Sequence, residues 1–115
     1  MIIPTSIILS INRKCGDYKK PQIIYATHDA EGSVKAILSL NGRRYQVPEG
    51  AEVQIVGVLP VGVSVTVLCS VDGTDVTIPI DARLTTVAGR VWCTVCIVDA
   101  DGKRASTESF YISVS

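Results

Sequence analysis

The chain has 115 residues, of which 47% are hydrophobic, 19% charged and 5% aromatic. This length is too short for two domains of ordinary size, so we expect a single domain over residues 1–115. Eleven basic side chains balance eleven acidic ones, which excludes the overall basic excess that most nucleic-acid-binding proteins use to contact phosphates. The hydrophobic fraction also excludes an intrinsically disordered chain.

The hydrophobic residues are strongly biased toward side chains that branch at Cβ. The chain contains 16 Val and 13 Ile but only 6 Leu, and its 9 Thr raise the β-branched total to 38 residues. Such side chains lose rotamer freedom in helices and pack well on a pleated sheet. The composition therefore predicts an all-β domain rather than a helical bundle.

Signals for membrane insertion and secretion are missing from the sequence. No segment reaches the roughly 18 uncharged apolar residues that a membrane-spanning helix needs. The apolar residues 1–9 have neither a basic leader nor a small-residue cleavage site. We therefore expect no membrane span and no secretory signal.

In the first half of the chain, hydrophobic residues alternate with others at the period of a β-strand. Asn41-Gly42 lies between two such segments and predicts a tight hairpin, because both residues tolerate a positive φ. The expected strands lie near residues 7–12, 23–25, 34–40, 43–47 and 52–58.

The second half of the chain is rich in valine and continues the same alternation. After a bend at residues 59–62, we expect one long strand from Val63 to Val71 with its odd-numbered residues facing the core. Asp72-Gly73 and Asp101-Gly102 predict two further hairpins, and residues 81–87 leave room for one helical turn. The other expected strands lie near residues 76–80, 90–98 and 110–114.

These eight or nine short strands and three glycine hairpins predict an antiparallel β-sandwich of about 7–9 strands, which we favour over a small barrel. Pro79 has no N–H to donate to a neighbouring strand, so we expect its strand at an edge of a sheet.

Four cysteines, at positions 15, 69, 93 and 96, raise the question of a metal or redox site. Cys93 and Cys96 form a Cys-x-x-Cys pair, but they lie in a predicted strand, where residues three apart point to opposite faces. A second pair or a nearby histidine that would complete a zinc site is missing. We therefore predict free thiols, no metal site and no cofactor. The sequence leaves open whether Cys69 and Cys93 approach closely enough to form a disulfide.

The sequence also offers little for catalysis. His28 is the only histidine, and no serine has a nucleophile-elbow sequence around it. Asp99 and Asp101 resemble the start of a calcium-binding loop, but Lys103 and Phe110 occupy positions where that loop needs ligands. We therefore predict no catalytic residues and a protein that is not an enzyme, with a small hydrolase that uses His28 as a minor alternative.

Two groups of basic residues stand out, one near the N-terminus and one after the first hairpin. They are Arg13, Lys14, Lys19, Lys20, Arg43 and Arg44. We interpret both groups as solvated loops, and a surface for an anionic partner is the less favoured alternative.

One strand face is a candidate for binding another protein. If Val91 and the following odd-numbered residues face the core, the opposite face of the strand carries Arg90, Trp92, Thr94, Cys96 and Val98. Tryptophan is enriched among the residues that anchor protein interfaces, so Trp92, Cys96 and Val98 are our candidates for a partner interface. Two alternatives remain open: the chain's own loops cover this face, or the register is reversed and Trp92 lies in the core.

Three segments in the last third of the chain carry a family resemblance. They are a short segment that ends in glycine, a strand with an Asp-Gly hairpin, and a closing Thr-x-x-Phe-x-Ile-x-Val strand, at residues 83–89, 91–103 and 106–114. A strand that ends at Asn12-Arg13, the His28-Asp29 turn and the segment from Leu38 to Gly42 fit the same pattern. Together these segments resemble the N-terminal domain of phage baseplate upper proteins.

The resemblance implies an immunoglobulin-like β-sandwich that serves as an attachment module in a virion and has no catalytic residues. It implies contacts with other phage structural proteins or with further copies of itself. The resemblance also implies a location in the virion, and in the host cytoplasm during assembly. The balanced charge and the lack of a long apolar segment predict no contact with nucleic acid or membrane.

Members of that family continue into a helical linker or fibre, whereas this chain stops at Ser115. We therefore expect a stand-alone adaptor, or a protein that decorates a capsid or tail. The runner-up is a carbohydrate-binding sandwich that recognises host-surface glycans, although such modules generally present more aromatic rings than this chain has.

Overall fold

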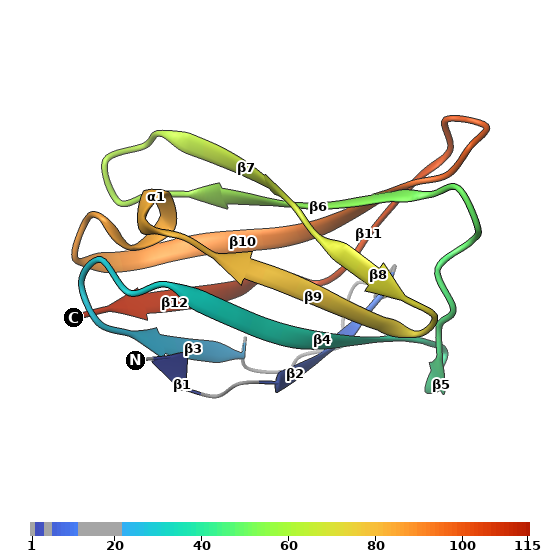
Figure 1. The fold of residues 1–115 in the computed structure, drawn as a ribbon, viewed down its shortest axis with the longest axis horizontal. Helices are drawn as coiled ribbons and strands as arrows, with labels where there is room; N and C mark the ends of the chain where they lie inside the picture. The colour runs from blue at the N-terminus through green and yellow to red at the C-terminus, as the bar shows by residue number, and fades with distance from the viewer. Residues whose placement is uncertain (1, 4–5, 12–21) are drawn as a thin grey trace.

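Two β-sheets pack face to face in the computed structural model, which describes residues 2–3, 6–11 and 22–115 (Figure 1). Sheet A has seven strands in the order β1-β3-β12-β10-β6-β7, with β11 paired to β10. Its strands are β1 (Ile2–Ile3), β3 (Ile23–Ala26), β6 (Glu52–Val58), β7 (Ser64–Leu68), β10 (Gly89–Val98), β11 (Arg104–Ser106) and β12 (Phe110–Val114).

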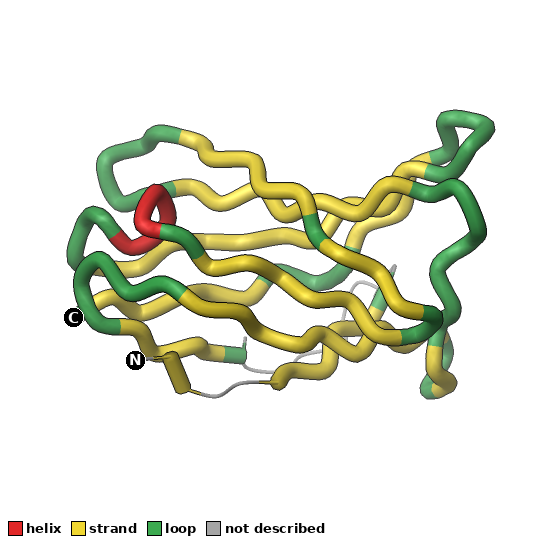
Figure 2. Tube along the Cα trace, viewed as in Figure 1, coloured by secondary structure: helices red, strands yellow, loops and turns green. Residues whose placement is uncertain are grey.

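Sheet B has five strands in the order β2-β4-β9-β8, with β5 paired to β4. Its strands are β2 (Ser6–Ser10), β4 (Gly32–Leu40), β5 (Arg43–Arg44), β8 (Ser70–Asp72) and β9 (Asp75–Ile80). Figure 2 shows that strands fill most of the described chain, while the loops gather toward the two ends of the sandwich. The all-β sandwich is thus confirmed.

Two pairs of neighbouring strands depart from the antiparallel arrangement that the hairpins predict. β12 runs parallel to β3, and β2 runs parallel to β4. A hairpin forces its two strands to be antiparallel, but neither of these pairs is joined by one. The direction of such strands is set by how the two sheets close around the core, which alternation along the chain does not encode.

The core lies between the sheets and is formed by the inward-facing residues that the alternation predicted. On β10, Val91, Cys93, Val95 and Ile97 are buried, and every second residue of β12 from Phe110 is buried as well. The largest side chains with almost no exposed surface are Phe110, Leu9, Ile24, Leu38, Ile55, Ile78, Ile80, Leu84, Ile97 and Ile112. Burial of this apolar surface is the main contribution that stabilises the fold.

The prediction of one continuous strand from Val63 to Val71 is wrong. The chain forms β7 at the edge of sheet A, leaves it at Cys69 and continues as β8 at the edge of sheet B. Val63 is 57% exposed and Val71 is 39% exposed, although both were expected to face the core. The period-two alternation continues through the change of sheet, so it does not reveal the break.

The hairpin prediction at Asn41-Gly42 is confirmed by positive φ angles of 54° and 79°, which a tight turn of this kind requires. The return strand β5 is shorter than expected, because it ends at Arg44. Pro79 was expected on an edge strand, but β9 lies between β4 and β8. The proline is tolerated there because β8 pairs only with residues 75–77, so no ladder hydrogen bond is lost on that side.

The predicted helical turn is also present, as α1 (Ala82–Thr85). Asp81 caps it, because its carboxylate accepts a hydrogen bond from the Arg83 backbone N–H at 2.9 Å. Leu84 is fully buried and packs so close to β6 that a Cβ at Gly57 would lie 2.9 Å from its Cδ2. The glycine therefore allows α1 to close one end of the sandwich.

Candidate functional site

The outer face of sheet A carries the residues that the sequence singled out for a partner. The alternating burial of β10 places its odd-numbered residues in the core, so the expected register is confirmed and the reversed register is wrong. Trp92 points outward and is 44% exposed. The loops of the described residues therefore do not bury this side chain.

Trp92 belongs to a small aromatic cluster with Tyr111 of the neighbouring strand. The two residues lie directly opposite each other on β10 and β12, and their ring centroids are 5.0 Å apart with the planes tilted by 55°. The Arg90 guanidinium lies over the Tyr111 ring, 4.7 Å from its centroid. Tilted aromatic pairs and cation–π contacts of this kind are both attractive.

The same contacts bury Tyr111 although it points away from the core. Only 8% of Tyr111 is exposed, yet it does not belong to the hydrophobic cluster between the sheets. Its ring is covered from outside, by Trp92 and Arg90. The exposed Trp92 ring therefore packs against the nearly buried Tyr111 ring, which lowers the conformational entropy that Trp92 would lose on binding.

Strand register extends this cluster sideways into what we call the apolar patch, formed by Ile23, Tyr111, Trp92 and Val58. These residues lie side by side across β3, β12, β10 and β6. Val58 is 40% exposed and Ile23 is half-buried. The patch is thus a row of apolar side chains that crosses four strands and carries no charge.

The row next to the apolar patch, toward the C-terminal end of β12, adds one more exposed ring. Tyr25 lies opposite Ser113, which lies opposite Arg90, and Tyr25 is 55% exposed. The patch is therefore bordered on this side by an aromatic ring and a cation.

The other two predicted interface residues share the face but not the patch. Cys96 lies two rows from Trp92 and is flanked by Ser106 and Gln54. Val98 lies between the charged residues of its row, Arg104 and Glu52, and both Cys96 and Val98 are half-buried.

A polar pair separates Cys96 and Val98 from Trp92. The hydroxyl groups of Thr94 and Ser109 lie 3.0 Å apart in the intervening row. The structure thus centres the candidate site on Trp92 and places the three predicted residues along one face rather than in one cluster.

Cys69, Cys93 and Cys96 are free thiols. Cys93 and Cys96 point to opposite faces of β10, as the period of a strand predicts. Burial raises the pKa of Cys93 to about 12 and, against a smaller opposing effect of a backbone hydrogen bond, raises that of Cys69 to about 12. Such thiols stay protonated near neutral pH and are poor nucleophiles. Cys15 lies outside the described residues.

His28 has a structural environment. Its Nε2 donates to the Thr86 carbonyl at 2.9 Å, and its Nδ1 lies 3.0 Å from an Asp29 carboxylate oxygen. The neighbouring Thr85 hydroxyl donates to the Ala30 carbonyl. The bonds to the Thr86 and Ala30 carbonyls join the β3–β4 turn to α1 and to the residue that follows it.

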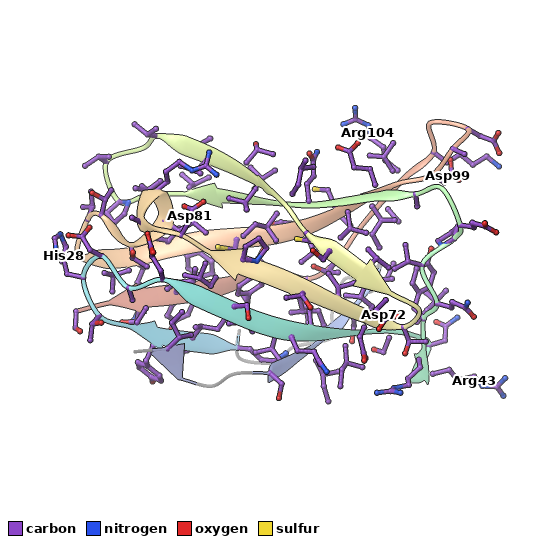
Figure 3. All side chains as sticks on the ribbon, in the orientation of Figure 1. His28, Arg43, Asp72, Asp81, Asp99 and Arg104 are labelled. Carbon is purple, nitrogen blue, oxygen red and sulfur yellow. The ribbon has the colours of Figure 1, made fainter. Side chains whose placement is uncertain are left out.

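The acidic residues considered for metal binding do not gather around the histidine. Figure 3 shows His28 and Asp81 toward one end of the sandwich and Asp72 and Asp99 toward the other. The Asp99 carboxylate accepts from the backbone N–H groups of Asp101 and Lys103, which explains the loop without a cation. Among residues 2–3, 6–11 and 22–115, no group of three or more His, Cys, Asp and Glu side chains could hold a metal ion.

Of the basic residues, Arg43 and Arg44 are exposed on β5, and Arg44 lies 4.0 Å from the Asp75 carboxylate. The N-terminal group, Arg13, Lys14, Lys19 and Lys20, lies outside the described residues. No helix in the described part of the chain is long and apolar enough to cross a membrane.

Tyr111 was not among the residues expected at this site, and Arg90 was expected on the same outer face but was not assigned to the interface. Alternation along residues 110–114 does place Tyr111 on the outer face. What it lacks is the register between β10 and β12, which brings Tyr111 opposite Trp92.

Comparison with known proteins shows the fold alone. No protein-family model matches the chain, and no curated protein matches it significantly. Among solved structures, the chain is similar to the N-terminal domain of phage TP901-1 ORF48, with a TM-score of 0.66 and 15% sequence identity. The match covers 96% of this chain and 98% of the other, so the two chains have the same overall fold along almost their whole lengths.

Proposed function

We propose that this protein is a non-enzymatic structural protein of a phage virion, an attachment module of the baseplate or tail. The observation that carries the proposal is the fold that it has in common with a phage domain over 96% of the chain. The sequence resemblance to the N-terminal domain of baseplate upper proteins points to the same class of proteins. In this role the protein acts through contacts with other virion proteins and resides in the virion.

The apolar patch is the surface that we assign to the virion partner. Trp92 offers a large exposed ring that is already held in place by Tyr111, and a side chain of this kind is a typical centre of a protein interface. Cys96, Val98 and the polar row beside Trp92 then form the rim of the same interface.

The proposal is tested with purified virions and with the purified protein. Mass spectrometry of the particles should detect the protein, and the recombinant chain should bind a separated virion protein. Trp92→Ala should weaken this binding by at least about 30-fold, as expected for an interface anchor. Ile8→Ala is the matched control, because Ile8 is 57% exposed on the outer face of the other sheet.

Absence of the protein from the particles would refute the virion role. If Trp92→Ala bound the virion protein as tightly as wild type, the interface would lie outside the apolar patch. Binding to capsid proteins alone would replace the attachment role by capsid decoration.

The exposed rings also support a second candidate, a module that binds host-surface glycans. Trp92 and Tyr25 lie on the same face and are 44% and 55% exposed, and sugar rings stack on aromatic side chains of this kind. A glycan array distinguishes the two candidates: a specific signal that Trp92→Ala abolishes would favour glycan binding, and no signal would leave the structural role.

A further inference from the structure

The edge of sheet A formed by β7 differs from the other strand edges of the described chain. β7 ends the strand order of sheet A and pairs on one side only, with β6. No charged residue occurs between Glu52 and Asp72. In the hairpin of β6 and β7, Glu52 is therefore the one charged residue, and β7 itself has none. An open edge without charge is one to which a further strand can add.

The backbone groups that β7 leaves open can be assigned from its register. Leu59 donates to the Val63 carbonyl and Cys69 donates to the Val53 carbonyl, so the odd-numbered residues of this segment bond to β6. Hydrogen-bonding direction alternates along an antiparallel strand. The N–H and C=O groups of Ser64, Thr66 and Leu68 therefore point away from β6, toward the open edge.

The other strand edges among the described residues are covered, short or charged. On β2, the Gln22 side chain bonds both the N–H and the C=O of Ile8, and Glu108 bonds both backbone groups of Ser10. β1 has two residues, and β8 has three and ends at Asp72. Such features are the usual protection of sheet edges against further pairing.

β7 is also complementary to a second copy of itself. In an antiparallel pair centred on Thr66, Ser64 lies opposite Leu68 of the second copy, and Thr66 lies opposite its own equivalent. These three residues of each chain would form about six backbone hydrogen bonds. On the core side, Val65 lies opposite Val67 of the second copy, which are two β-branched residues of the kind that pair well across strands.

Charge does not oppose this contact. In a two-fold symmetric strand pair, charged residues near the axis face like charges, which destabilises pairing. β7 has no such residue, and its exposed Leu68 and the neighbouring Val63 would instead lose contact with water.

We propose that β7 pairs with the β7 strand of a second copy of this chain, so that sheet A continues across a two-fold axis. The proposal does not rest on the virion role, because it uses an edge of the sheet rather than the apolar patch. A pair of five-residue strands buries less surface than the about 1,600 Å² of a typical stable interface. The dimer should therefore depend on concentration.

The test is sedimentation velocity over a range of concentrations, with two substitutions at the same position. Wild type should shift from monomer to dimer as the concentration rises. Thr66→Lys places two like charges opposite each other at the axis and should weaken the dimer at least about tenfold. Thr66→Val keeps a β-branched, uncharged side chain and should dimerise as wild type does.

Amide hydrogen exchange by NMR locates the contact. The amides of Val65 and Val67 should be protected at all concentrations, because they bond to β6. Those of Ser64, Thr66 and Leu68 should become protected only as the dimer forms.

The proposal would be overturned by a wild-type chain that is still monomeric at about 1 mM, by a dimer that Thr66→Lys leaves intact, or by a dimer in which the three outward amides stay unprotected. A monomer whose β7 edge instead binds a strand of another virion protein would also overturn self-pairing.

Discussion

The outer faces of the two sheets are built from different chemistry, although both sheets bury apolar inner faces against each other. On sheet A, Trp92, Tyr111, Val58 and Ile23 form an uncharged row. On sheet B, the row across β2, β4, β9 and β8 consists of Ser6, Lys35, Thr77 and Ser70. Water solvates this polar row of sheet B well, whereas the row of sheet A exposes apolar surface that a partner can bury.

The next row of the outer face of sheet B contains a charged residue, Asp75, which the apolar patch on sheet A lacks. Asp75 lies 3.7 Å from Lys35 and 4.0 Å from Arg44, while Ile8 is the one strongly exposed apolar residue of the row. The face of sheet A thus depends on packing of rings, and the face of sheet B on weak ion pairs. Salt, pH and substitutions should therefore affect the two faces differently.

The largest expected effect is that of removing Tyr111, the ring on which the apolar patch rests. Tyr111→Ala should lower the free energy of unfolding by about 3 kcal/mol, because a nearly buried ring is lost and Trp92 and Arg90 lose their contact. Urea denaturation measures the change. Tyr25→Ala on the same face removes a half-exposed ring and should cost less than about 1 kcal/mol; equal losses in the two variants would contradict the clustered face.

The next effect is a loss of stability at alkaline pH, and it comes from a thiol in the core between the two sheets. The pKa of Cys93 is about 12 in the folded protein, against 9.0 for an unperturbed thiol. Above pH 9 the unfolded chain loses this proton while the folded chain keeps it. The free energy of unfolding therefore keeps its full contribution from the protonated Cys93 thiol below pH 9. As the pH rises from 9 toward 12, this contribution falls by up to about 1.4 kcal/mol per pH unit.

Denaturation at pH 8 to 10.5 tests this pH dependence with two variants. Cys93→Ala should reduce the alkaline slope, and the raised pKa of Cys69 should account for part of what remains. Val95→Ala, a truncation on the same side of β10, should destabilise at every pH and keep the slope. An unchanged slope in Cys93→Ala would show that this thiol is not shielded from water.

A smaller effect is expected from the cation that covers the patch. Arg90→Ala should cost about 0.5–1 kcal/mol through the lost contact with Tyr111. Arg90→Lys should recover part of it, because lysine keeps the charge but not the planar stacking. Thermal unfolding of the three proteins gives the comparison, and a fully stable Arg90→Ala would mean that Trp92 alone covers Tyr111.

The smallest effect belongs to the ion pairs of sheet B. Asp75→Asn removes the pairs with Lys35 and Arg44 and should cost about 0.5 kcal/mol at low salt and less at high salt. Urea denaturation at two salt concentrations measures this salt dependence. The destabilisation by Arg90→Ala should not depend on salt, because the contact of Arg90 with Tyr111 is a stacking contact rather than an exposed ion pair. A salt-independent loss in Asp75→Asn would assign its role to packing instead.

Local features of the chain could be predicted well. The strand from Glu52 to Val58, the hairpin at Asn41-Gly42 and the helical turn before Gly89 all occur where the sequence placed them. Each depends on neighbouring residues, through alternation, turn geometry or a cap. The candidate site was found in part, because the outward position of Trp92 follows from the same alternation.

Features that depend on distant pairing were not predicted. The change of sheet at Cys69, the parallel pairs of β12 with β3 and of β2 with β4, and the burial of Tyr111 each require knowledge of which strands are neighbours. The polar row between Trp92 and Cys96 is of the same kind, since Ser109 comes from another strand.

The sequence by itself determined that this chain folds into β-strands and which side of most strands faces the core. Both follow from β-branched composition and period-two alternation, which act within a few residues of the chain. Only the tertiary structure decided which outward side chains meet. Strand order and register are set by the joint packing of both sheets, so they turned an isolated Trp92 into an apolar patch and left β7 as an open, uncharged edge.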